Sequence, residues 1–468
     1  MLLRRFYDDK LAQASYMIGC QATGEAVVVD PHRDTDVYVR AAAAEGMAVR
    51  YVTETHIHAD FLSGSRQLAR HTGATLLLSA EGGEDWQYGF AEQDGAQLLR
   101  DGDHIQLGKV TLTVLHTPGH TPEHLSFAVT DGAASSEPMG VLTGDFLFVG
   151  DVGRPDLLEK AAGIAGTMEA GARVLWKSLQ RFKDLPDYLQ ILPGHGAGSA
   201  CGKALGSVPS STLGYEKMVN WAFQCADEAE FVERVLEDQP EPPVYFAHMK
   251  RMNRDGPVVL EKLSTPTHLT AEELATRLRE GATVVDLRSR GDFASGHLPE
   301  SLNIPWGQDF TTWAGWLLPY DAPIYFVAYD QEQAEGAARD LALIGIDRSE
   351  GFADTGVLDW WSGAVAPLQR TTVTDWQGAD RAVEEEDALL LDVRNLTEWN
   401  EGHVAGAEHI HLGRLREVAE TLDRDRPVLV YCRSGNRSGI GASLLQAAGF
   451  ADVRNIEGGI RAREAIHS

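Results

Sequence analysis

Short apolar runs alternate with turn-forming residues through the first half of the chain. Five of these short apolar runs predict strands, at 26–30, 49–55, 75–79, 110–117 and 139–145. Helical patterns at 35–45 and 168–182 lie between them. Strands and helices mixed in this way predict a layered α/β domain, which we expect to span 1–245. Stretches rich in turn-forming residues at 237–243, 253–257 and 264–268 predict an exit segment and a linker, which we place at 246–266.

The rest of the chain contains one long repeat. The segment VVDLRSRGDFASGHLPESLNIP from Val284 matches LLDVRNLTEWNEGHVAGAEHIH from Leu390. A repeat of this length indicates duplicated domains, which we place at 267–365 and 374–468 with a linker at 366–373. Each copy reads strand, helix, strand, helix, a pattern typical of a mostly parallel sheet. The sequence therefore predicts a multi-domain α/β protein.

The net charge of the chain limits the classes of partner that we expect. Lys and Arg number 41 against 69 Asp and Glu, and the resulting charge of −28 repels nucleic acid and anionic membranes. The first residues, MLLRRFYDDKLAQASYMIG, lack the apolar run of a secretory leader, and no later run is long enough to span a membrane. We therefore expect a cytoplasmic protein with no nucleic-acid or membrane partner.

Histidines and aspartates gather directly after predicted strands. Four motifs carry them, THIHAD at 55–60, HTPGHTPEH at 116–124, TGD at 143–145 and LPGHG at 192–196. The side chains concerned are His56, His58, Asp60, His120, Asp145 and His195. An isolated histidine is usually a core or surface residue, but six such groups at strand ends predict a metal site.

The order HxHxD, PGHT, GD, PGHG resembles the metallo-β-lactamase superfamily, over about residues 1–240. The resemblance implies an αββα sandwich. Binuclear hydrolases of that superfamily, such as glyoxalase II, carry a further histidine after HxHxD, where this chain has Phe61. An aromatic ring cannot bind a metal, so Phe61 favours one metal over two. The segments GDVGRPDLL at 150–158 and GAGSACGKALG at 196–206 look like the persulfide dioxygenase branch.

That branch implies one Fe(II) per chain, held by His56, His120 and Asp145. Two imidazoles and a carboxylate leave three positions open for substrate and O₂. The remaining groups, His58, Asp60 and His195, either orient the ligands or are relics of an ancestral second metal site. Arg154 and Asp156 are candidate substrate-binding residues, with an ion pair between domains as the alternative for Arg154.

The second repeat carries a candidate sulfur-transfer loop. The strand PVLVYC ends at Cys432, which opens the loop CRSGNRS before a helix. Backbone N–H groups at a helix start, together with Arg433 and Arg437, favour a thiolate and bind anions. The loop resembles that of rhodanese sulfurtransferases over about residues 374–462. A phosphatase loop is excluded because Ser438 stands where its arginine is required.

The first repeat lacks this chemistry. Ala328 stands where the cysteine is needed, and acidic residues follow it. We interpret this repeat as a pseudo-rhodanese that spaces the active domains. Arg394 of the second repeat is a further candidate for contact with the bound anion, but the role that we expect for it is a structural salt bridge.

The whole chain resembles persulfide dioxygenase and rhodanese fusion proteins of bacterial sulfide detoxification. The implied reaction converts a small thiol persulfide, O₂ and water to thiol and sulfite, and the rhodanese forms or uses thiosulfate. Glutathione, coenzyme A and bacillithiol all remain possible carriers, and we expect a homo-oligomer. Cys201 is a candidate relay for persulfide sulfur, with a structural role as the alternative. Two other functions remain open, a glyoxalase II-like thioester hydrolase and a non-enzymatic sulfide-responsive scaffold.

Overall fold

A computed structural model describes residues 1–157, 167–199, 201–202, 205–237, 239 and 241–467. The chain divides into two compact units, Met1–Lys262 with Leu343–Gly345, and Leu263–Ala342 with Ile346–Ser468. Within the described residues, no helix combines the length and apolar character needed to cross a bilayer. Each unit is described by itself below.

Two six-stranded sheets form the first unit. The first sheet, in spatial order, contains β1 Leu2–Asp8, β2 Gln13–Cys20, β3 Glu25–Val29, β4 Ala48–Thr53, β5 Thr75–Ser79 and β6 Gln97–Leu99. The second contains β12 Ser211–Thr212, β11 Gln190–Pro193, β10 Gly140–Gly144, β9 Leu125–Asp131, β8 Val110–His116 and β7 His104–Leu107. Strands β3 and β4 run parallel, as do β10 and β11.

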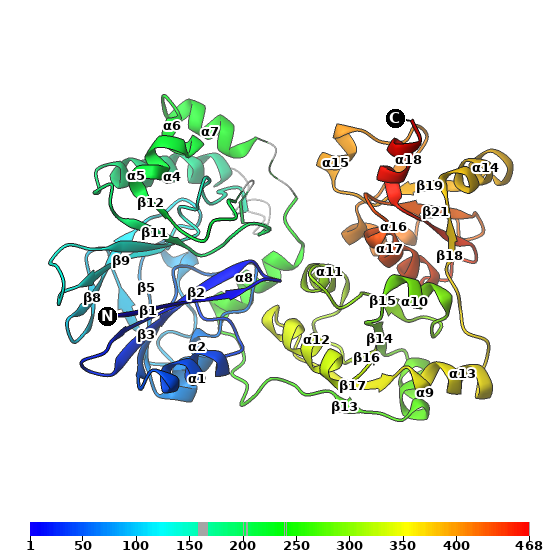
Figure 1. Ribbon diagram of the computed structural model, residues 1–468, viewed down its shortest axis with the longest axis horizontal. Helices are drawn as coiled ribbons and strands as arrows, with labels where there is room; N and C mark the ends of the chain where they lie inside the picture. The colour runs from blue at the N-terminus through cyan, green and yellow to red at the C-terminus, as the bar shows by residue number, and fades with distance from the viewer. Residues whose placement is uncertain (158–166, 200, 203–204, 238, 240, 468) are drawn as a thin grey trace. The chain divides into compact units, whose positions relative to one another are not determined.

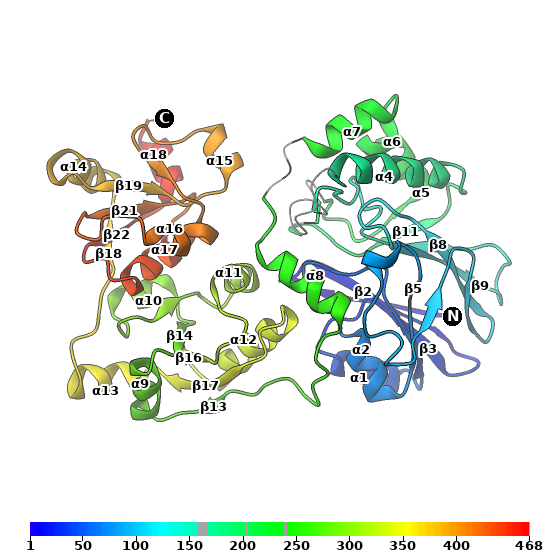
Figure 2. The same ribbon diagram turned by 180° about the vertical axis from the view of Figure 1, so that it is seen from behind.

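Alternation along the strands packs the sheets together. In β2, Tyr16 and Ile18 join the core between the sheets, whereas Met17 joins the core beneath the outer helices. Helices α1 (Asp36–Ala44) and α2 (Ser65–Thr72) cover the first sheet (Figure 1). The second sheet is covered by α4 Thr167–Lys183, α5 Leu213–Val219, α6 Trp221–Gln224 and α7 Glu228–Leu236 (Figure 2). The αββα sandwich implied by the sequence is confirmed.

The stretch expected to be a linker contains helix α8 (Tyr245–Asp255), and α8 belongs to the first unit. Asn253 on this helix is buried, and its Nδ2 donates to the carbonyls of His58 and Phe61, both at 2.8 Å. Its Oδ1 accepts from the Ser63 N–H at 2.9 Å. One side chain of α8 thus fixes the loop that follows β4.

The second unit contains two five-stranded sheets whose paired strands all run parallel. The first has the order β13 Thr267–His268, β17 Ser349–Asp354, β16 Ile324–Ala328, β14 Thr283–Asp286 and β15 Leu302–Asn303. The second has the equivalent order β18 Thr372–Thr374, β22 Val453–Ile456, β21 Val428–Tyr431, β19 Leu389–Asp392 and β20 Glu408–His409. The matching strand order shows that the sequence repeat is a duplicated fold.

Each repeat packs its own helices around its sheet. The first has α9 Ala271–Arg279, α10 Arg290–Ser295, α11 Phe310–Leu317, α12 Gln331–Leu343 and α13 Gly356–Ala364. The second has α14 Trp376–Glu386, α15 Leu396–Glu401, α16 Leu415–Ala419, α17 Asn436–Ala447 and α18 Gly459–His467. Contacts between α10 and α17 join the two repeats within this unit.

Candidate metal centre and cysteine loop

Strand pairing brings the predicted metal motifs to one edge of the first unit. Gly144 of β10 pairs with Pro193 of β11 in parallel, so Asp145 and His195 emerge side by side. Val29 and Thr53 pair in the same way, which places Asp30 next to the segment that carries His56.

His56, His120 and Asp145 form a buried three-donor cluster. One ligand atom from each lies within 4.8 Å of the others. Both imidazole Nε2 atoms face Asp145 Oδ2, at 3.9 Å from His56 and 3.8 Å from His120. Asp145 Oδ2 is buried and has no hydrogen-bond partner among the described residues. A buried, unpaired carboxylate oxygen is costly unless a cation occupies the site. The geometry therefore indicates a metal.

Hydrogen bonds on the far side of each imidazole set its tautomer. His120 Nδ1–H donates to the Arg154 carbonyl at 3.1 Å, which leaves the lone pair on Nε2. His56 Nδ1 bonds the Thr55 hydroxyl at 2.9 Å, and that hydroxyl in turn donates to Asp30 Oδ2. His56 Nδ1 is then the donor, so both Nε2 atoms are available as metal ligands.

Three groups fix Asp145. Its Oδ1 accepts from His195 Nδ1 at 2.7 Å, and its backbone N–H donates to His124 Nε2 at 3.1 Å. Gly144 has a φ of +49°, and a Cβ there would lie 2.7 Å from His124 Nε2. Glycine is therefore required in TGD for both conformation and space. His124 lies in the motif HTPGHTPEH but was not predicted to act at the site.

Charge and burial prepare these side chains for a cation. Burial first, and then the nearby His58, lower the pKa of His56 well below its usual value. Burial also lowers the pKa of His120. Burial alone would raise the pKa of Asp145, but His195, His56 and His120 together hold that pKa well below the usual range. Two neutral imidazoles thus face one ionised carboxylate.

His195 and Asp60 lie one bond beyond the three donors. His195 Nε2 bonds Asp60 Oδ2 at 2.7 Å, so the ring is held between two carboxylates. Burial opposes protonation of His195, yet Asp145 and Asp60 raise its pKa well above the usual value. The arrangement supports a role in orienting Asp145, which is one of the two alternatives that the sequence left open.

His58 is bonded to Asp30, and its Nδ1 is buried without a hydrogen-bond partner among the described residues. Its Nε2 bonds Asp30 Oδ1 at 3.0 Å, and Asp30 Oδ1 also accepts from the Thr55 N–H. Asp30 has a φ of 52°, which is uncommon for a non-glycine residue and aims its carboxylate at this junction. The ring of Phe61 is buried 4.4 Å from that of His58. Asp30 and Thr55 are supporting residues that sequence reasoning missed.

The candidate sulfur-transfer residues of the second unit also come together. Cys432 follows β21 and is buried, and its Sγ accepts from the Gly435 N–H at 3.2 Å and from the Ser438 hydroxyl at 3.5 Å. Arg437 donates to both oxygens of Glu398, at 2.6 and 2.7 Å. Arg433, on the same loop, is exposed. The loop thus surrounds the thiol with hydrogen-bond donors.

Arg394 has the structural role expected of it. It donates to both Asp392 oxygens and to the Gly402 carbonyl, and Arg288 makes the equivalent bonds to Asp286 and Gly296 in the first repeat. Because the first repeat has the same arginine–aspartate pair but no cysteine, this pair stabilises the fold and is not specific to the cysteine loop.

In the first repeat, Ala328 ends β16 at the place of Cys432. Asp330 Oδ1 accepts from the Gln333 N–H at 2.9 Å, so a carboxylate occupies the helix start that would otherwise bind an anion.

Similarity to known proteins fits this geometry. The crystal structure of a metallo-β-lactamase from Staphylococcus aureus subsp. aureus COL is 44% identical, covers 75% of this chain and 99% of that chain, and has a TM-score of 0.70. This chain belongs to the metallo-β-lactamase superfamily. The model of that superfamily matches residues 8–195, and the model of the rhodanese-like domain matches 270–362 and 375–465. The chain is a fusion of one metallo-β-lactamase domain and two rhodanese-like domains.

Two relatives of the metallo-β-lactamase domain carry different names. Persulfide dioxygenase ETHE1, mitochondrial, of Bos taurus is 28% identical over 200 residues, which are 42% of this chain and 68% of the relative. A hydroxyacylglutathione hydrolase of Rhodospirillum rubrum is 28% identical over 186 residues, 38% of this chain and 60% of the relative. The chain therefore spans less than two thirds of the hydrolase.

Arg154 and Asp156 form a buried pair beside the metal centre of this superfamily member. Arg154 donates to both oxygens of Asp156, at 2.9 and 2.7 Å, and neither side chain is exposed. The Arg154 carbonyl also holds His120. This pair lies within one domain, and its contribution to substrate binding stays a prediction.

Cys201 lies next to the predicted ligand shell. One donor atom each from Asp60, His195 and Cys201 lies within 4.8 Å of the others. Burial raises the pKa of the Cys201 thiol well above its usual value, and Asp60 and Asp145 add to the effect. Cys201 therefore lies beside Asp60 and His195, and its role stays a prediction.

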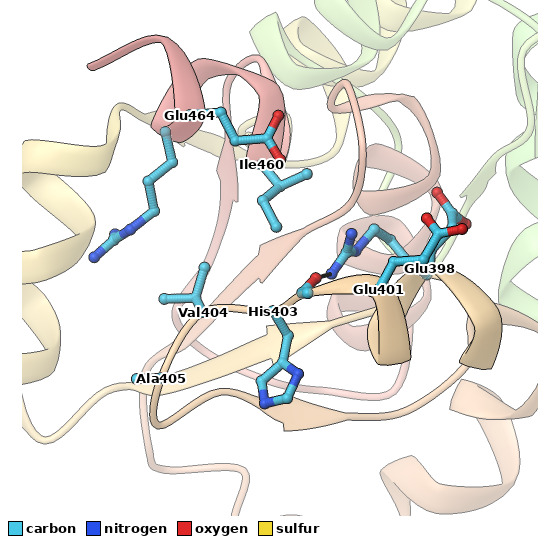
Figure 3. Close-up of a pocket in the computed structure, with 10 residues that line it drawn as sticks. Glu398, Glu401, His403, Val404, Ala405, Ile460 and Glu464 are labelled. Atoms are coloured by element: carbon cyan, nitrogen blue, oxygen red, sulfur yellow. Dashed lines mark hydrogen bonds between the residues drawn. The ribbon is translucent and has the colours of Figure 1, made fainter. Parts of the chain in front are cut away.

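A pocket of about 450 Å³ adjoins the cysteine loop. Figure 3 shows Glu398 of α15, Val404 and Ile460 of α18 among its lining residues. Two of these contact the loop, because Glu398 pairs with Arg437 and the Ile460 N–H donates to the Cys432 carbonyl. The pocket is large enough for part of a small thiol.

Proposed function

We propose that the metallo-β-lactamase domain is a non-haem Fe(II) persulfide dioxygenase and that the second rhodanese domain transfers sulfur. The observation that carries this proposal is the buried cluster of two neutral imidazoles and one carboxylate, with Asp145 Oδ2 unpaired among the described residues. Phe61, where a second-metal histidine would stand, supports a single ion. Similarity to the Bos taurus persulfide dioxygenase supports the same function.

The proposed reaction converts one persulfide, one O₂ and one water to one thiol and one sulfite, with release of two protons. Fe(II) bound by His56, His120 and Asp145 would supply the redox chemistry that activates O₂ and would bind the persulfide sulfur. The protein holds both imidazoles in the required tautomer and fixes Asp145 through His195. Zinc fits the same donors but is redox-inert.

The proposed second step uses the loop of Cys432. A Cys432 persulfide gives its outer sulfur to sulfite: the sulfur–sulfur bond breaks, a bond to the sulfite sulfur forms, and Cys432 leaves as the thiolate with thiosulfate as product. The reverse reaction loads Cys432 from thiosulfate. The Gly435 N–H and the Ser438 hydroxyl are placed to stabilise the thiolate.

We further propose a small thiol persulfide, O₂, sulfite and thiosulfate as the partners, and a homo-oligomer in the cytoplasm. Glutathione, coenzyme A and bacillithiol each present a thiol on a polar tail. Neither nucleic acid nor a membrane is proposed as a partner, because the chain carries a net charge of −28.

A thioester hydrolase is the second candidate. Similarity to a hydroxyacylglutathione hydrolase favours it, as does the cluster of Asp60, His195 and Cys201 beside the first three donors. Such an enzyme requires two metals, and Phe61 removes one histidine from the second site.

Oxygen-electrode assays of iron-loaded protein, with each of the three persulfides in turn, test the proposal. We expect O₂ uptake with equimolar sulfite from at least one persulfide, and about one iron per chain. Hydrolysis of a glutathione thioester by protein with two zinc ions per chain, without O₂ uptake from any persulfide, would favour the hydrolase.

A further inference from the structure

The loop that carries Cys432 is contacted from outside by the first rhodanese repeat. Arg290 is the first residue of α10, and it reaches the start of α17 in the second repeat. A Cβ built on Gly435 would lie 2.2 Å from Arg290 Nη1, and one on Gly439 would lie 3.5 Å from the Arg290 Cβ. The Arg290 side chain therefore lies along the loop and the first turn of α17.

Gly435 fits this contact in two ways. Its φ of 95° lies in the left-handed region that favours glycine, and the missing side chain makes room for the guanidinium. The Gly435 N–H is also a donor to Cys432 Sγ. Arg290 thus contacts Gly435, the residue whose N–H donates to the sulfur of Cys432.

The two nitrogens of this guanidinium have different surroundings. Nη2 donates to Glu457 at 2.8 Å, and Glu457 is 56% exposed. Nη1 is buried and has no hydrogen-bond partner among the described residues. The buried side of the cation therefore faces the cysteine loop without a bonded anion.

Two other arginines near the loop are paired with buried or half-buried carboxylates, whereas Arg433 on the loop itself is exposed. Arg394 is bound to Asp392, and Arg437 is bound to Glu398 through two short bonds. Among the described residues, Arg290 pairs only with the well-exposed Glu457, whose charge water screens. Arg290 therefore keeps more of its positive charge available to the loop.

We propose that Arg290, a residue of the repeat without a cysteine, is a positioning residue of the sulfurtransferase site in the other repeat. Its guanidinium lies against Gly435 and supplies positive charge to a loop that receives sulfite and thiosulfate, which are both anions. This inference rests on the proposed sulfur transfer, and it gives the first repeat a part in that reaction. The role applies to sulfur donors and acceptors that are anionic.

Alkylation of Cys432 by two reagents of similar size tests the charge directly. Iodoacetate is an anion and iodoacetamide is neutral, so their rate ratio reports the electrostatic field at the thiol. The rate of each is followed by mass spectrometry of the peptide that contains Cys432, in the full chain. Variants are Arg290→Met, Arg290→Lys and Glu457→Gln, with Arg277→Met as the control, because Arg277 is a half-exposed arginine of the same repeat on α9.

We expect Arg290→Met to slow iodoacetate about tenfold while iodoacetamide changes less than about twofold. Arg290→Lys should restore much of the ratio, and Glu457→Gln should raise it above the wild-type value, which damage to the fold would not do. In sulfur transfer, Arg290→Met should raise the KM for thiosulfate more than it lowers kcat.

The inference would be overturned if Arg290→Met slowed both reagents equally or slowed neither of them. It would also be overturned if Arg277→Met gave the same change, or if Glu457→Gln left the ratio of the two rates unchanged. The alkylation ratio does not depend on turnover. Wild-type protein that transfers no sulfur but shows the expected ratios would therefore contradict the proposed function and leave the role of the Arg290 charge standing.

Discussion

At the residue scale, the carboxylate of Asp145 is divided between two contacts. Oδ1 is bound by His195, and Oδ2 faces the imidazoles of His56 and His120. Asp145→Ala removes the only negative charge of this three-donor cluster. We expect it to weaken iron binding at least about a hundredfold and to abolish persulfide-dependent O₂ uptake. Metal analysis of the purified variant and an oxygen electrode measure the two effects.

Asp85→Ala is the matched control, because Asp85 is an exposed aspartate of the same unit. It should keep both iron and O₂ uptake. Oxygen consumption at the wild-type rate by Asp145→Ala would contradict the assignment of the metal ligands.

Cys201 offers a second test at this scale. If it relays persulfide sulfur, Cys201→Ser should slow O₂ uptake several-fold and shift the ratio of sulfite to thiosulfate, with iron content unchanged. Its raised pKa means that the thiol needs an additional positive charge nearby to ionise. Cys225→Ser, at a cysteine that bonds the Trp221 carbonyl, is the control. An unchanged rate and product ratio would assign Cys201 a structural role.

The sequence predicted the three donors because each stands in a short motif directly after a strand. It did not predict His124, Asp30 or Thr55 as parts of the site. Their contribution lies in hydrogen bonds to a backbone N–H, a hydroxyl or the far side of a ring, and sequence spacing does not encode such directions. His124 could have been predicted, because it lies in the same motif as His120.

At the scale of elements, strands with a clear apolar run were predicted closely. The run at 75–79 is β5, and that at 110–117 is β8, which ends at His116. The sequence pattern gave no separate prediction for β1 and β2, because Arg4 and Arg5 interrupt the first and the second is buried on both faces. Helix α8 was assigned to a linker because the proline-rich and turn-forming stretches on both sides of it dominate the local pattern.

His297 at the end of α10 makes the first repeat sensitive to acid. The ring stacks on Phe293 with centroids 3.6 Å apart, and burial lowers its pKa to about 4 from the usual 6.5. The folded state then binds this proton less readily than the unfolded chain. The contribution of His297 to the free energy of unfolding is complete above pH 6.5. It is lost as the pH drops toward 4, and the loss amounts to at most about 3 kcal/mol.

Thermal unfolding followed between pH 7 and pH 4 checks this expectation. His297→Asn should flatten the loss of Tm over that interval, whatever its effect at pH 7. His403→Asn changes the equivalent, exposed histidine of the second repeat and is the control for loss of an imidazole. A pH profile of His297→Asn that parallels wild type would contradict the role of His297.

At the scale of the whole molecule, the two proposed chemistries belong to separate compact units with their own cores. Changing one site should therefore leave the other active. Cys432→Ser is expected to eliminate transfer of sulfur from thiosulfate to a thiol, because a serine hydroxyl neither ionises near neutral pH nor carries sulfane sulfur. Sulfite formation from persulfide should continue at a rate within about twofold of wild type.

Separate assays of sulfite, thiosulfate and O₂ on the same preparation measure this separation. Cys20→Ser, at a buried cysteine of the first unit, is the control and should keep sulfur transfer. Transfer at the wild-type rate by Cys432→Ser would show that a different thiol carries the sulfur.

The contacts of Asn253 bear on how the first domain is obtained alone. A chain cut after residue 245, where the sequence pattern places the domain end, loses α8, so the His58 and Phe61 carbonyls and the Ser63 N–H lose their partner. Each unpaired buried group costs on the order of 1–3 kcal/mol, in the loop that leads from His56. For expression of an isolated, metal-competent domain, the stop codon belongs after Lys262, where the continuous part of this compact unit ends. That chain keeps Asn253 but loses the segment Leu343–Gly345 of the same unit, whose Leu343 carbonyl accepts from the Leu62 N–H at 2.7 Å.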